Sequence, residues 1–141
     1  MRVMVMIKAT PQSEAGAMPS EDLLVAMGNY NDALLAAGVL KGGEGLHPSG
    51  AAVRLRLADG AVTEEAGPFP IPGLVAGFWL WEVASMEEAV AWARRCTHPM
   101  PGEEAELELR RVFSAEDFGE AMTPELRAQE DHQRAVLEGK I

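Results

Sequence analysis

Glu44 and His47 lie three residues apart in a glycine-rich segment, where the backbone allows a ligand to approach closely. A glutamate can act as a general base, and an imidazole titrates near neutral pH, so the two together could move a proton on a bound substrate. They are the predicted catalytic residues. The alternative is that His47, next to Pro48, is solvated and that Glu44 pairs with a nearby arginine.

A second set of polar residues follows the pattern of one strand face. Glu106, Glu108 and Arg110 alternate with apolar residues, and an arginine can hold a carboxylate or phosphate with two hydrogen bonds. If this face points into a cavity, the residues can orient a small substrate; if it points outward, they are ordinary surface charges. Large aromatic residues could wall the same pocket, although at this spacing they are more often core or interface. The predicted ligand-binding residues are Lys8, Phe69, Trp79, Trp81, Glu108 and Arg110.

Other reaction centres find no support in the sequence. The three histidines lie far apart, and the single cysteine, Cys96, has no partner for a metal knuckle or a disulfide. There is also no phosphate-binding loop, dinucleotide fingerprint or nucleophile elbow. We therefore predict no metal and no cofactor.

Composition narrows the class of protein further. The formal net charge of −10 opposes approach to nucleic acids and anionic lipid surfaces. No apolar stretch is long enough for a membrane span, and the lone cysteine suits a reducing compartment, so a cytoplasmic location is expected. A length of 141 residues fits one domain, with residues 114–141 as a C-terminal helical extension.

Hydrophobic periodicity and capping residues predict the elements that must position these side chains. Asp59-Gly60 is a favoured hairpin turn and places Arg54 opposite Glu65. Ser20 and Ser85 are typical residues before helices, and Gly38 is typical after one. The predicted order is strand 3–7, helix 21–37, a short or bulged strand within 39–48, hairpin 52–65, strand 74–83, a helix from 86 that ends before the proline-rich stretch 97–102, strand 105–110 and helix 124–138, with a loop at 9–19. This order predicts a ferredoxin-like α+β fold, an antiparallel sheet with two helices on one face and an inserted β-hairpin.

The sheet is expected to need a partner. Strands 3–7 and 74–83 are apolar on both alternating sets of residues, whereas two helices can cover only one face. A twofold homodimer is the simplest cover for the other face. The alternative is that the long loops and the C-terminal helix fold back over it.

Several short stretches together resemble the DGPF family within the YCII-related proteins of bacteria, over about residues 3–113. The stretches are Gly43-Glu44-Gly45-Leu46, Gly67-Pro68-Phe69, Gly77-Phe78-Trp79-Leu80, Met86-Glu87-Glu88-Ala89, Cys96-Thr97-His98-Pro99 and Glu106-Leu107-Glu108-Leu109-Arg110. The resemblance implies a dimeric α+β barrel, in which two sheets face each other around a cavity. The aspartate that begins the family motif is replaced here by Ala66, and the Lys-Glu pair that usually follows is replaced by Pro72-Gly73.

Two functions of different classes fit these features. The first is a dimeric small-molecule-binding protein that could act as a cofactor-independent proton-transfer enzyme on a small carbonyl or acid compound. The second is a non-catalytic interaction or regulatory module, which the family's association with alternative sigma factors and the missing aspartate favour. An enzyme needs a cavity with converging polar groups, whereas a module needs an exposed patch.

Overall fold

A four-stranded antiparallel sheet forms the centre of the first of two compact units, Met1–Arg111 and Val112–Ile141. The computed structural model describes residues 1–140, and the two units are described separately. The strand order is β2 (Leu40–Gly45), β5 (Val75–Glu82), β1 (Arg2–Lys8) and β6 (Leu107–Arg111). The two strands predicted to be central, β1 and β5, are central, and the predicted antiparallel α+β fold is confirmed.

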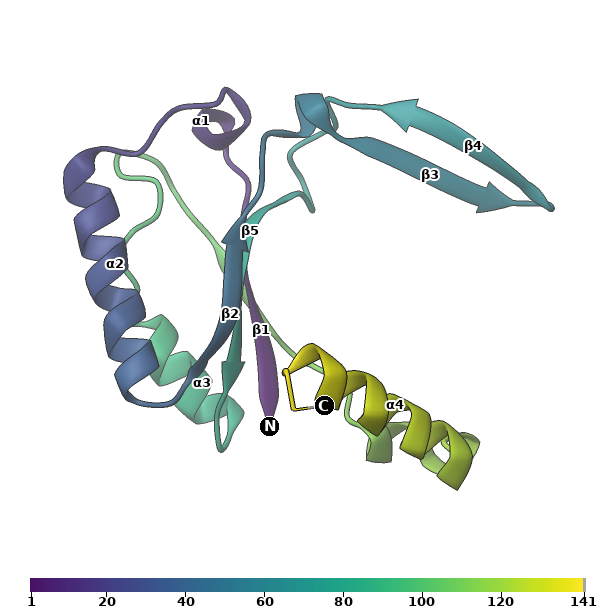
Figure 1. Cartoon of the computed structure of the whole chain (residues 1–141). Helices are drawn as coiled ribbons and strands as arrows, with labels where there is room; N and C mark the ends of the chain where they lie inside the picture. Colours follow the sequence, from purple (N-terminus) through teal and green to yellow (C-terminus); the bar gives the residue numbers. More distant parts are fainter. Residues whose placement is uncertain (141) are drawn as a thin grey trace. The chain divides into compact units, whose positions relative to one another are not determined.

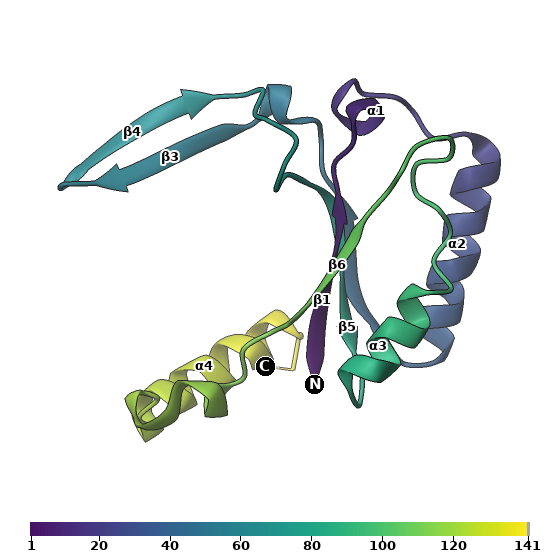
Figure 2. The same cartoon turned by 180° about the vertical axis from the view of Figure 1, so that it is seen from behind.

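Two helices, α2 (Glu21–Ala36) and α3 (Met86–Ala93), cover the same face of this sheet (Figures 1 and 2). Both begin at the predicted serines: the Ser20 hydroxyl accepts the Leu23 amide at 3.1 Å, and the Ser85 hydroxyl accepts the Glu88 amide at 3.1 Å. Such caps satisfy amides that have no partner within the helix.

The segment predicted as a loop at 9–19 contains a short helix, α1 (Pro11–Glu14). The Thr10 hydroxyl accepts the Ser13 amide, and the Ser13 hydroxyl accepts the Thr10 amide, so this single turn is capped reciprocally. Proline at the first helical position is also favourable, because its missing N–H needs no partner there. The polar, proline- and glycine-containing sequence of this segment predicted only a loop, because a single capped turn is too short to show helical periodicity.

Residue alternation divides the sheet into a helix-covered face, under α2 and α3, and an opposite face, which we call the helix-free face because these two helices leave it uncovered. Val3 pairs with Trp81 and Val5 with Trp79, and these four buried side chains pack with Leu34 and Ala89 of the helices. The intervening residues of β1 and β5 point the other way and are half-buried. The apolar centre of the helix-free face is made of Met4, Met6, Phe78 and Leu80.

The predicted hairpin is present as a separate two-stranded sheet, β3 (Val53–Ala58) and β4 (Ala61–Ala66). Arg54 lies opposite Glu65 as expected, and Asp59 and Gly60 both have positive φ, the conformation that this two-residue turn requires. A 3-10 turn, Ser49–Ala51, precedes β3. Every residue of both strands is exposed.

The second unit contains the predicted C-terminal helix, α4 (Pro124–Leu137), after a 3-10 segment at Ala115–Ala121. Thr123 caps α4 by accepting the Leu126 amide at 3.2 Å. The rings of Phe113 and Phe118 stack within the same unit, with centroids 5.1 Å apart. Among the residues described, none of the helices has the length and apolar character needed to cross a membrane.

Candidate functional site

Charged side chains border the apolar centre of the helix-free face at both edges of the sheet. The register aligns Glu44, Phe78, Met6 and Glu108 in one row across the four strands. In the next row, Arg110 lies opposite Met4. The face is therefore an apolar floor with a carboxylate at one edge and both signs of charge at the other.

Lys8 and Glu108 form an ion pair on this face. The Lys8 ammonium lies 3.5 Å from a Glu108 carboxylate oxygen, and the Lys8 side chain is only 19% exposed. Arg110, two residues after Glu108, shares its face and is exposed. A guanidinium and a shielded ammonium at one edge of an apolar floor can bind a small anion or polarise a carbonyl oxygen.

Glu44 and His47, the predicted catalytic residues, lie at and just beyond the end of an edge strand. Glu44 lies on β2, at the opposite edge from Glu108, three strand spacings or about 14 Å away along the sheet. His47 follows the end of β2, and both residues are exposed. Within residues 1–140, neither side chain makes a hydrogen bond or ion pair.

Trp79 and Trp81 lie on the helix-covered face, opposite to Lys8, Glu108 and Arg110. Trp81 is fully buried, and the indole N–H of Trp79 donates to the Asn31 side chain at 2.9 Å. Their rings lie 5.9 Å apart, in the middle of the core. Both rings therefore occupy core positions, because the helices cover this side of β5.

Phe69 belongs to a buried polar node that sequence patterns do not reveal. The buried Ser49 hydroxyl accepts the Phe69 amide at 2.9 Å and donates to the Glu14 carboxylate, which also accepts the Ser49 amide at 2.9 Å. The three segments lie far apart in the sequence, so no local spacing indicates the contact. Gly67 is required beside this node: a Cβ there would lie 1.7 Å from the Ser49 carbonyl oxygen.

The hydroxyl of the buried Tyr30, on α2, and the thiol of the half-buried Cys96 lie at the hydrophobic core. The Tyr30 hydroxyl donates to the Trp92 carbonyl at 2.7 Å, and burial raises its pKa well above the usual range. Burial also raises the pKa of the Cys96 thiol to about 11. Both groups therefore remain protonated at neutral pH, and neither is an activated nucleophile.

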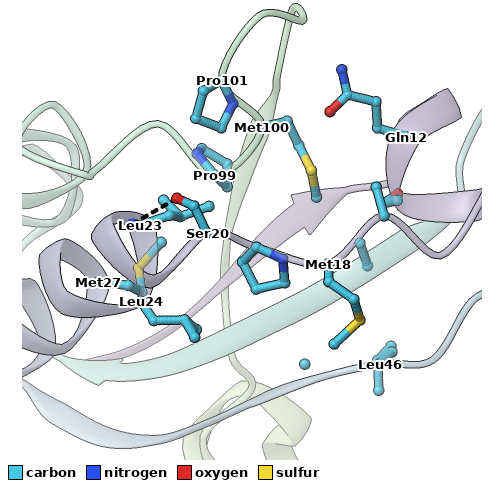
Figure 3. Close-up of a pocket in the computed structure, with 15 residues that line it drawn as sticks. Gln12, Met18, Ser20, Leu23, Leu24, Met27, Leu46, Pro99, Met100 and Pro101 are labelled. Carbon is cyan, nitrogen blue, oxygen red and sulfur yellow. Dashed lines mark hydrogen bonds between the residues drawn. The ribbon is translucent and has the colours of Figure 1, made fainter.

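A groove runs between α2 and the free edge of β2. It comprises two adjacent cavities of about 500 and 620 Å³ that share Leu24, Met27, Pro99 and Met100. Figure 3 shows methionines from three segments around it, namely Met18, Met27 and Met100. Glu44 is the one charged residue among its described lining residues. The groove suits an apolar ligand but lacks a cation to fix an anion.

Comparison with known protein families identifies the family of this chain. A model of the family described as YCII-related domain matches residues 1–113, which is the whole first unit and two residues beyond. No curated protein matches the chain. The match is to the broad family, so the resemblance to its DGPF branch stays a prediction.

Proposed function

Since the chain belongs to the YCII-related family, we propose that it is a homodimer that binds a small carbonyl or carboxylate compound on the helix-free face of its sheet. The observation that carries the proposal is the position of Lys8 and Arg110 beside the apolar floor of Met6 and Phe78. An apolar floor with a few charged groups at its edge is the usual composition of a small-molecule site.

A homodimer would cover the apolar centre of the helix-free face. The half-buried apolar side chains at the centre of the helix-free face favour contact with another surface. If a surface of the second copy covers this face, the space above Phe78 and Met6 is enclosed. The charged edges then point inward, where reduced solvent screening strengthens their attraction for an anion.

The same arrangement suggests a reaction. A carbonyl oxygen held by Arg110 or Lys8 makes the neighbouring C–H more acidic, and a carboxylate can remove that proton. Within one chain Glu44 lies about 14 Å from Glu108, too far to reach this C–H, so the proposed base is Glu44 of the partner subunit, because Glu108 already pairs with Lys8. His47 is three residues further along and would act only on a substrate that extends past the end of β2.

Thermal unfolding in the presence of small carboxylates and keto acids tests the binding proposal. Compounds that stabilise the wild type should lose their effect in Arg110→Met and Lys8→Met. Arg94→Met is the matched control, because Arg94 is an exposed residue just after α3 on the helix-covered side. Leu24→Lys, in the groove, should also leave the stabilisation intact.

Different results identify the alternatives. A stabilisation that is lost in Leu24→Lys but kept in Arg110→Met would move the ligand to the groove. If no compound stabilises the protein, the interaction-module function is favoured instead. For a compound that binds, exchange of its acidic C–H for deuterium, measured by NMR, should disappear in Glu44→Gln if proton transfer occurs.

A further inference from the structure

The β3–β4 hairpin, residues 53–66, projects from the end of the first unit's sheet, and we call it the arm (Figures 1 and 2). Its pairing sorts the side chains by polarity. Arg54, Glu65, Arg56 and Thr63 share one face. The other face carries Val53, Leu55, Leu57, Val62, Glu64 and Ala66, and its leucines and valines are 55% to 78% exposed.

The arm is nevertheless firmly attached at its base. The Gly67 amide donates to the Ala52 carbonyl at 2.8 Å, which continues the ladder by one bond. The Arg54 guanidinium lies 3.9 Å from the centre of the Phe69 ring, and Phe69 is held by Ser49. The base of the arm is therefore tied to the polar node at Ser49.

A two-stranded hairpin with one apolar face is marginally stable in water unless that face is covered. The surface that fits it is present in the same chain. The helix-free face has an apolar centre on strands of seven and eight residues, comparable in length to the six-residue strands of the arm. Both surfaces span roughly 20 Å along the strand direction.

Charge also matches between the two surfaces. Glu64 is the charged residue on the apolar face of the arm. The helix-free face offers two cations at its β6 edge, Lys8 and Arg110. Because both complementary surfaces occur in each chain, a twofold pair of copies can satisfy them twice, by reciprocal exchange of arms.

We propose that the arm of each subunit packs on the helix-free face of a second copy and closes the ligand site there, adding the Glu64 carboxylate beside Lys8 and Arg110. The inference rests on the proposed function in requiring a homodimer. It goes further by assigning part of each site to the partner subunit. The site of a single chain is then incomplete.

Sedimentation equilibrium of arm variants tests the packing. Leu55→Ser combined with Leu57→Ser should weaken the dimer more than about a hundredfold, because four leucines per dimer lose their apolar contact. Arg56→Ser, between them on the opposite face, is the matched control and should leave the mass unchanged. Glu64→Gln should weaken the dimer roughly fivefold, whereas Glu65→Gln should not.

Cross-linking tests the contact directly, in a Cys96→Ala background that removes the single native thiol. One chain carries Leu57→Cys and a differently tagged chain carries Met6→Cys, and the co-expressed pair is treated with a short bis-maleimide. A link between the two chains supports the proposal. A dimer that forms no such link, and that tolerates the two leucine substitutions, overturns the arm packing but leaves the homodimer of the proposed function. A wild type that is monomeric at all concentrations overturns both.

Discussion

The polar node at Ser49 gives the most direct stability prediction. Ser49 is 4% exposed, and its hydroxyl donates to the Glu14 carboxylate and accepts the Phe69 amide. Ser49→Ala removes both bonds. The backbone amide of residue 49 keeps its own bond to Glu14, so only the side-chain contribution changes.

The expected loss of stability comes from the Glu14 carboxylate and the Phe69 amide, which lose their bonds to the Ser49 hydroxyl. A hydrogen bond to a charged group contributes roughly 1.5–3 kcal/mol, and a buried amide left unpaired costs roughly 1–3 kcal/mol. Glu14 is half-buried, so water can replace part of its bond, whereas Phe69 is buried. We expect Ser49→Ala to lower the free energy of unfolding by about 2–3 kcal/mol.

Urea unfolding at fixed protein concentration measures this loss, since any self-association makes stability depend on concentration. Ser20→Ala is the matched control: it removes an exposed helix cap and should cost about 1 kcal/mol. The double variant with Glu14→Gln should be less than additive, because both residues act in one node. A Ser49→Ala loss no greater than that of Ser20→Ala would refute the reasoning.

Three further predictions concern Gly67, Tyr30 and Cys96. Gly67→Ala should destabilise the first unit by roughly 3 kcal/mol or more, because its Cβ would overlap the Ser49 carbonyl oxygen, whereas Gly50→Ala meets open space and should change the urea midpoint little. Tyr30→Phe should lower the free energy of unfolding by about 1 kcal/mol through loss of the bond to Trp92, and a change below the error of the urea fit would contradict that bond. Thiolate absorbance should show Cys96 titrating near pH 11. Because the folded pKa of this thiol is raised from 9.0, its contribution to stability is complete below pH 9 and is lost as pH rises through 11. Cys96→Ala should not show this loss.

Local chemistry explains why so many elements were predictable from the sequence. The turn at Asp59-Gly60 set the hairpin register, and Ser20, Ser85 and Thr123 marked the starts of three helices. Beside Ser85, the Glu88 carboxylate also accepts the Ala84 amide. These features depend on residues within four positions of each other, so spacing along the chain is enough to read them.

The candidate site depended on choices that spacing does not encode. Both alternating sets of β5 are apolar, so polarity did not tell whether the helices cover Trp79 or Phe78, and the fold decided by packing Trp79 and Trp81 under α2 and α3. Glu44 and Glu108 were both recognised, but only the strand order separates them to opposite edges.

The sequence by itself determined the family, the order of elements and the hairpin register, because each follows from short-range patterns. Tertiary structure alone decided which face of the sheet α2 and α3 cover, brought Lys8 to Glu108, and joined Glu14, Ser49 and Phe69 in one node. Those contacts link residues 20 to 100 positions apart, and they form only when the strands have paired and the loops have closed over them.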